Sequence, residues 1–194
     1  MNKNKFSSII ITAGALLVFA SLLLLIYNEI TAYEAGNVID LSAAEWDEED
    51  EEIILLDNEE ESVAVVTLDG NTYMGYITIP SLGLNLPVLS EWSYTNLKIA
   101  PCRYSGTADS GNLIICGHNY TTHFGMLKNL TVGDDIYYVS IDGTVYHYTV
   151  TELETLAGTA VEEMISSDYD LTLFTCTYSG QSRVTVRCTL QDID

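Results

Sequence analysis

Basic residues are scarce in this chain. Its 194 residues include seven Lys and Arg against 28 Asp and Glu, which gives a formal net charge of −21. A protein this negative repels phosphates instead of releasing their counterions, which argues against nucleic-acid binding. Charged residues of both signs make up only 18% of the chain and hydrophobic residues 47%, a balance that excludes a disordered chain. The length fits one domain with short appendages.

Histidine is equally scarce. The three histidines, at positions 118, 123 and 147, are separated by 5 and 24 residues, and this spacing forms no recognisable zinc site. The acidic runs lack the interspersed Gly or Asn of a calcium-binding loop. The sequence therefore predicts no metal and no cofactor.

The N-terminal segment is the longest stretch without charge. Residues 6–27 are uncharged and rich in Leu and Ile, and as a helix they would be about 33 Å long, enough to cross a bilayer core. Basic residues precede the segment and acids follow it (Lys3, Lys5, Glu29, Glu34). A cleavable signal peptide is the alternative, but its apolar region is normally only about 7–15 residues long. We predict a cytoplasmic tail at 1–5, a single-pass membrane anchor at 6–28, and an extracellular remainder.

Residues 29–62 are predicted to form an acidic extracellular tether. Acids fill positions 47–52 and 59–61 without interruption, and like charges at this density repel one another and disfavour compact packing. Between the two runs lies an apolar island, residues 53–56, which could dock on the domain as a short helix or strand.

From residue 63 onward the pattern favours β-structure. Short runs of β-branched and aromatic residues predict strands at 73–79, 86–89, 113–116, 136–140, 144–151, 171–177 and 183–190. Asp69-Gly70 and Asp142-Gly143 mark tight turns, and the second lies between two strands as in a hairpin. Only residues 153–165 could carry a turn or two of helix. This pattern predicts an all-β barrel or sandwich over residues 63–194.

The last predicted strand alternates with period two. Arg183 and Arg187 therefore share one face, while Cys188 faces the core on the other. The exported part of the chain has only five basic residues: Lys98, Arg103, Lys128, Arg183 and Arg187. Two arginines on one strand face of such an acidic protein indicate that positive charge has a specific role there.

The four cysteines differ in their surroundings. An even number in an exported domain permits disulfides, with three possible pairings. Cys116 and Cys188 lie in apolar strand patterns typical of core thiols, and Cys102, next to a proline in a loop, stays open between the two interpretations. Cys176 ends an apolar strand and faces a loop, the rigid yet accessible setting that a nucleophile needs.

A nucleophilic thiol requires a basic or positive neighbour. His118 follows another apolar strand, in the same strand-end setting as Cys176, whereas His147 lies inside a strand and His123 in a polar loop. Arg183 follows Cys176 through a short loop and could return to the same rim. These three residues are the candidates for catalysis.

The chain contains, in this order, a histidine, the run Thr-Leu-Phe-Thr-Cys at 172–176, and an arginine. With this order of residues the sequence resembles the sortases, exported cysteine transpeptidases of Gram-positive bacteria. The matching blocks, in chain order, are residues 77–88, Gly117-His118-Asn119, 127–134, 171–177 and 183–187. The tripeptide Gly-His-Asn is similar to the sequence around the corresponding histidine in class B sortases. The resemblance implies an eight-stranded β-barrel with short helices behind the N-terminal transmembrane helix, and a substrate-selecting segment at 152–170.

The resemblance also implies the roles of individual residues. Cys176 would be the nucleophile, His118 the general acid and base, and Arg183 the oxyanion-binding arginine, with Thr175, Asn119 and Arg187 binding substrate. The implied partners are secreted proteins with a C-terminal sorting signal such as Leu-Pro-x-Thr-Gly, and an amine of a peptidoglycan precursor or a pilin lysine.

The sequence leaves two alternative functions. An exported cysteine hydrolase is one, but papain-like peptidases place Cys before His in the chain, and here His118 precedes Cys176. The other is a catalytically silent β-barrel binding module, which would contain no selectively reactive thiol.

Overall fold

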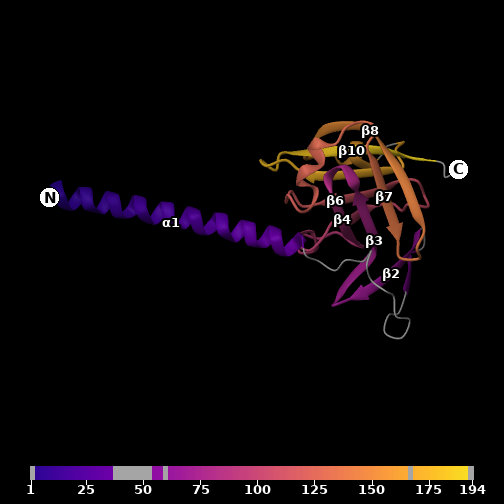
Figure 1. Ribbon diagram of the computed structural model, residues 1–194, viewed down its shortest axis with the longest axis horizontal. Helices are drawn as coiled ribbons and strands as arrows, with labels where there is room; N and C mark the ends of the chain where they lie inside the picture. Colours follow the sequence, from indigo (N-terminus) through magenta and orange to yellow (C-terminus); the bar gives the residue numbers. More distant parts are fainter. Residues whose placement is uncertain (1–2, 37–53, 59–60, 166–167, 192–194) are drawn as a thin grey trace.

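The computed structural model describes residues 3–36, 54–58, 61–165 and 168–191. One long helix, α1 (Lys3–Gly36), projects away from a compact body of strands (Figure 1). The strands are β1 (Ile54–Asn58), β2 (Glu61–Leu68), β3 (Asn71–Ile79), β4 (Leu84–Leu89), β5 (Cys102–Ser105), β6 (Leu113–Gly117), β7 (Asp135–Ser140), β8 (Val145–Ala157), β9 (Leu171–Cys176) and β10 (Ser182–Leu190). The short helices are η1 (Pro80–Leu82), η2 (Asn96–Lys98), η3 (Phe124–Asn129) and α2 (Val161–Ile165).

Eight of the strands close into a barrel. Their order is β3-β4-β5-β6-β9-β10-β8-β7, and β7 pairs back onto β3. Closure brings the two backbones very near at Gly75, where a Cβ atom would lie 2.2 Å from the carbonyl oxygen of Val139. A residue without a side chain is therefore required there. The predicted eight-stranded, all-β barrel is confirmed.

A hairpin of β1 and β2 extends the sheet beyond the barrel at β3. The turn between β2 and β3 uses the predicted Asp69-Gly70, both with positive φ. The apolar island at 53–56 contributes its last three residues to β1, so part of the segment predicted as a tether is paired strand. Residues 37–53, with the acidic run at 47–52, and residues 59–60 lie outside the described part.

Alternation along the strands produces two apolar clusters. On β6, Leu113 and Ile115 belong to a cluster that draws on seven strands of the barrel and fills its interior. Ile114 and Cys116 belong to the second, outer cluster, which includes Met164 of α2 and residues of the β4–β5 connection. Both faces of β6 are therefore buried, as expected for strands in parallel pairing.

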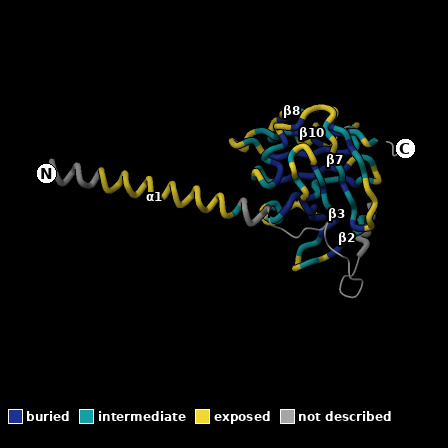
Figure 2. Tube along the Cα trace, viewed as in Figure 1, coloured by how far each residue is buried: buried dark blue, intermediate teal, exposed yellow. Residues whose placement is uncertain are grey.

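Helix α1 has the composition of a membrane span. The stretch Ile11–Thr31 has a mean hydropathy of 2.1, and none of it is buried against the rest of the protein (Figure 2). An exposed apolar surface of this size is stable in lipid and not in water. The helix continues beyond residue 28, where the predicted anchor ends, as far as Gly36.

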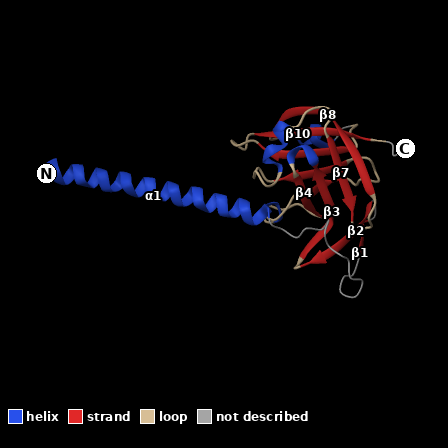
Figure 3. Ribbon diagram, viewed as in Figure 1, coloured by secondary structure: helices blue, strands red, loops and turns tan. Residues whose placement is uncertain are grey.

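All seven predicted strands are present, several with shifted ends (Figure 3). The short helix expected within 153–165 is present as Val161–Ile165, after β8, which continues to Ala157. Strands β2 and β5 were not predicted; β5 is four residues long and follows Pro101.

Candidate active site

Strand register brings the candidate residues to one edge of the barrel. Strands β6 and β9 are parallel, with Gly117 opposite Thr175. His118 and Cys176 are the residues that come next along these two neighbouring strands. Strand β10 runs antiparallel to β9 and places Arg183 directly opposite Cys176. His118, which is distant in sequence, thus meets Cys176 and Arg183 at adjacent strand ends.

Cys176 is the first exposed residue after five buried ones in β9. The preceding Thr175 is only 3% exposed, and its hydroxyl donates a hydrogen bond of 2.9 Å to the carbonyl oxygen of Gly117. This bond ties β9 to β6 immediately before both Cys176 and His118. The thiol is therefore accessible while its backbone is fixed.

His118 begins the connection that leads to η3. Its Nδ1 atom is buried, and no hydrogen-bond partner lies within reach among the described residues. The imidazole ring stacks on the ring of Tyr120, with 3.9 Å between centroids and 8° between planes. Burial, and secondly the positive charge of Lys98, lower the pKa of His118.

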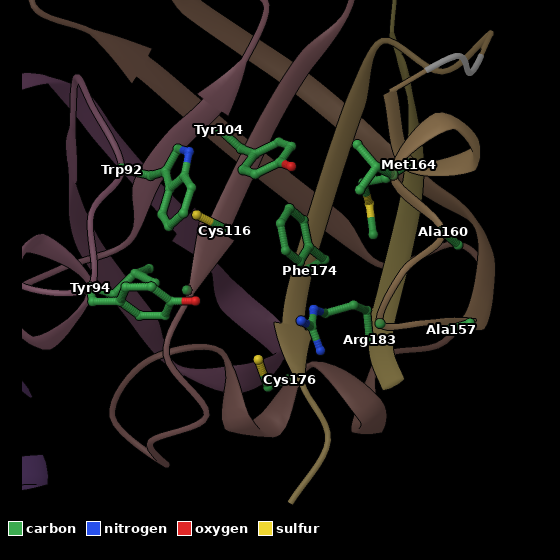
Figure 4. Close-up of a pocket in the computed structure, with 14 residues that line it drawn as sticks. Trp92, Tyr94, Tyr104, Cys116, Ala157, Ala160, Met164, Phe174, Cys176 and Arg183 are labelled. Atoms are coloured by element: carbon green, nitrogen blue, oxygen red, sulfur yellow. The ribbon is translucent and has the colours of Figure 1, made fainter. Parts of the chain in front are cut away.

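Arg183 is held at the start of β10. One terminal nitrogen donates hydrogen bonds to the carbonyl oxygens of Gly180, at 3.0 Å, and Ser182, at 3.1 Å. Among the described residues, no protein group bonds to the other terminal nitrogen or to Nε of the guanidinium. Figure 4 shows the Arg183 and Cys176 side chains at the same end of a pocket.

That pocket is apolar and has a volume of about 180 Å³. Aromatic rings line one side of it in a chain of contacts, from Trp92 to Tyr104 at 5.9 Å and from Tyr104 to Phe174 at 5.2 Å (Figure 4). Met164 of α2 lines the opposite side. Trp92 could not be predicted as a pocket residue because an isolated aromatic in a loop gives no periodic signal, and Phe174 could not because it lies within the apolar run of β9.

A second hollow lies on the other side of Cys176. It is larger, with a volume of about 560 Å³, and its lining is more polar: it includes His118, Asn119, Thr121 and Thr177. Cys176 lines both hollows, so an acyl group held on its sulfur could be approached from either side.

Arg187 does not reach this site. It is 2% exposed and lies beneath α2, where its guanidinium pairs with Glu154 at 2.7 Å. It also donates hydrogen bonds to Thr172 and to the carbonyl oxygens of Glu163 and Met164. Arg187 shares a strand face with Arg183, as alternation predicts, but the structure does not bring the two together.

The other three cysteines and His123 are buried. All four cysteines are free thiols, so none of the three possible disulfide pairings is present. Burial raises the pKa of Cys102 and Cys188 to about 12, and raises the pKa of Cys116 as well. His123, predicted in a polar loop, is fully buried. Within residues 3–36, 54–58, 61–165 and 168–191, no cluster of His, Cys, Asp or Glu could hold a metal ion.

An exposed thiol, an imidazole and a guanidinium at one edge can together carry out acyl transfer. Comparison with known proteins agrees with this chemistry. The sequence model of the sortase domain matches residues 77–191, more than half of the chain. Sortase A of Bacillus anthracis is 32% identical over 120 residues, which cover 59% of this chain and 57% of that protein.

Solved structures agree in fold. Sortase C1 from Streptococcus agalactiae superimposes with a TM-score of 0.58 at 26% identity, covering 66% of this chain and 72% of that one. Sortase A from Corynebacterium diphtheriae superimposes with a TM-score of 0.56 at 24% identity, covering 64% of this chain and 63% of that one.

Proposed function

Because the chain belongs to the sortase family, whose members are cysteine transpeptidases, we propose that it cleaves a sorting signal on secreted proteins and joins them to an amine. The proposed signal is of the Leu-Pro-x-Thr-Gly type, cut between Thr and Gly. The proposed acceptor is an amine of a peptidoglycan precursor or a pilin lysine. The observation that carries this proposal is the register that sets His118, Cys176 and Arg183 side by side.

In the first step the Cys176 thiolate attacks the carbonyl carbon of the signal's threonine. The new C–S bond gives a tetrahedral oxyanion, and the Arg183 nitrogens not bonded to Gly180 or Ser182 are available to donate to it. As the C–N bond breaks, the His118 imidazolium gives its proton to the departing glycine nitrogen. The product is a thioester on Cys176 beside a neutral imidazole.

In the second step the acceptor amine attacks the thioester carbonyl. Neutral His118 takes the proton from the attacking nitrogen, the C–S bond breaks, and the thiolate and imidazolium are regenerated. The apolar pocket on the Arg183 side is suited to the hydrophobic part of the signal. The polar hollow on the His118 side is suited to the amine, with Asn119 among its lining residues.

Thr175 and Arg187 are assigned supporting roles in this proposal. The Thr175 hydroxyl is already bonded to the Gly117 carbonyl, so it fixes the two strands instead of contacting substrate. Arg187 holds α2, whose Met164 lines the apolar pocket. Its contribution to substrate binding is therefore indirect.

We further propose that residues 6–28 anchor the protein and that the barrel is extracellular. Helix α1 is long and apolar enough to cross a membrane. Lys3 and Lys5 lie before it, and the positive-inside rule then leaves the short tail 1–5 in the cytoplasm. In this arrangement the acidic segment 29–62 separates the catalytic barrel, 63–194, from the anionic membrane surface.

The test uses the full chain in detergent with a peptide containing the sorting signal and a soluble amine. Cys176→Ala should abolish thioester capture and ligation, while Cys188→Ala, which alters a buried thiol in the barrel, should keep most activity. Arg183→Ala should lower kcat by about 10²–10³-fold, the usual loss of an oxyanion donor. Equal losses in the two cysteine variants would overturn the assignment.

The same assay separates the other functions. Cleavage without ligated product, at saturating amine, would identify a hydrolase using the same thiol. Absence of any cleavage, together with no selective reaction of Cys176 with a thiol-directed peptide probe, would indicate a binding module.

A further inference from the structure

Among the residues that the structure describes, none orients the ring of His118 by a hydrogen bond to its buried nitrogen. Sites that pair a nucleophile with an imidazole normally include a third group that accepts a hydrogen bond from the other ring nitrogen and fixes the ring. Here Nδ1 of His118 is buried, and the described part of the chain offers it no such partner. Something else must hold the imidazole in place if it is to serve the thiol.

The ring of Tyr120 is the contact that can do this. It lies parallel to the imidazole of His118, 3.9 Å away and tilted by only 8°. The Tyr120 ring also contacts the ring of His123, a fully buried residue, with 5.5 Å between centroids and 56° between planes. The Tyr120 ring is therefore placed between a core residue and the candidate catalytic base.

The backbone around Tyr120 is fixed as firmly as its ring. The Tyr120 carbonyl oxygen accepts hydrogen bonds from the N–H groups of His123, at 3.1 Å, and Gly125, at 2.9 Å. The approach is so close that a Cβ atom at position 125 would lie 2.6 Å from that oxygen. The N–H of Phe124 bonds to the carbonyl of His118 at 3.2 Å. The turn thus holds Tyr120 in one position relative to His118.

We propose that Tyr120 is the positioning residue of His118, and that its stacked ring both orients the imidazole and stabilises the imidazolium form. A cation over the face of a tyrosine ring is attracted by the ring's quadrupole. The inference rests on the proposed role of His118 as general acid and base, since that role needs the imidazolium beside the thiolate.

The other charged and titratable groups near His118 act in different directions. Lys98 of η2 disfavours the imidazolium by repulsion, and burial disfavours it further. Glu29 of α1 and Cys176 of β9 line the same hollow and carry negative charge when ionised. The stacked ring acts in the same direction as these negative charges and against burial and Lys98.

The chain contains its own control for this inference. His147 stacks on Tyr137 in a similar way, with 4.6 Å between centroids and 13° between planes, on the exposed side of the barrel. His147 also pairs with Asp135 at 2.8 Å and lines neither of the two hollows beside Cys176. Removing the Tyr137 ring perturbs a histidine stack without touching the candidate site.

The experiment measures the titration of each histidine by NMR in the full chain, in detergent, with selectively labelled histidine. A Cys176→Ala background removes coupling to the thiol. Tyr120→Leu should lower the pKa of His118 by about half a pH unit, the size expected for a lost cation–ring contact, while Tyr120→Phe, which keeps a ring, should not. Tyr137→Leu should affect His147 alone.

Two results would overturn the proposal: an unchanged His118 titration in Tyr120→Leu, or an equal shift in Tyr120→Phe. The NMR spectrum of the unmodified protein is an independent test that does not depend on a variant folding. A stacked tyrosine shifts the resonances of the His118 ring protons upfield, so resonances without this shift would disprove the stack. With Cys176 present, Tyr120→Leu should lower kcat about tenfold with little change in KM. Should the chain prove inactive as a transpeptidase, the NMR result still decides on the stack.

Discussion

Replacing Arg187 by methionine removes the buried guanidinium that joins α2 to the barrel. Its Nε lies 2.7 Å from a carboxylate oxygen of Glu154, and one terminal nitrogen is 3.0 Å from the hydroxyl of Thr172. The terminal nitrogens also donate to the carbonyl oxygens of Met164, at 3.2 Å, and Glu163, at 2.7 Å. Methionine has a similar length but offers no donor to any of these four acceptors.

The expected loss follows from burial. Breaking a buried ion pair by removing one partner costs about 3–5 kcal/mol, because the other charge stays without compensation. The Glu154 side chain is 29% exposed, so water replaces part of the lost contact. We therefore expect the free energy of unfolding to fall by about 2–4 kcal/mol. For a chain of this size that corresponds to a drop in Tm of about 4–16 °C.

Thermal and urea unfolding of the full chain in detergent, followed by circular dichroism, measures this loss. Arg183→Met is the matched control, since that guanidinium is partly exposed and bonds to two carbonyl oxygens. It should cost less than about 1 kcal/mol. Adding Glu154→Gln to Arg187→Met should recover part of the loss by removing the unpaired charge. A loss below about 1 kcal/mol in Arg187→Met, or an equal loss in Arg183→Met, would refute the reasoning.

Three further predictions concern the site and its surroundings. Gly117→Ala places a Cβ atom 2.5 Å from the ring of Phe124, so unfolding experiments should show a loss of about 1–3 kcal/mol, and an unchanged stability would contradict the observed packing. Trp92→Ala removes part of the pocket wall and should raise KM for the sorting-signal peptide about fivefold, with a smaller effect on kcat; an effect confined to kcat would contradict a binding role. Burial raises the pKa of Cys102 and Cys188 from 9.0 to about 12, so the folded state keeps both protons where the unfolded state loses them. Stability should therefore fall as pH rises from 9 to 12, which urea unfolding at pH 8 and 10.5 would detect.

Much of the fold could be predicted from the sequence because short runs of β-branched and aromatic residues mark most of the barrel strands. In β10 alternation with period two alone assigned Cys188 to the interior, where it is fully buried. Strand β5 could not be predicted: it is short, and its parallel pairing with β4 consists of the single pair Leu89 and Cys102. A strand fixed mainly by its neighbours has no pattern of its own.

The candidate site was predictable where it depended on strand ends. Cys176 and His118 each follow an apolar strand, and their meeting requires only that those strands be parallel neighbours, as they are. Tyr120 and the buried His123 were not predictable, because a stack between ring i and ring i+2 in a loop depends on the turn. That turn is fixed by the carbonyl oxygen of Tyr120, which accepts two backbone N–H groups.

The two arginines of β10 show where such reasoning from pattern ends. Alternation correctly assigns Arg183 and Arg187 to one face, four residues apart. Alternation cannot reveal what covers that face, and the cover differs along the strand: α2 lies over Arg187, while Arg183 borders the pocket with Cys176. The buried Arg187 guanidinium uses four of its five N–H groups on protein acceptors and has no surface from which to reach a substrate, whereas Arg183, anchored through a single nitrogen, can still donate. The same residue type on the same face therefore stabilises the pocket wall at one position and remains available for an oxyanion at the other.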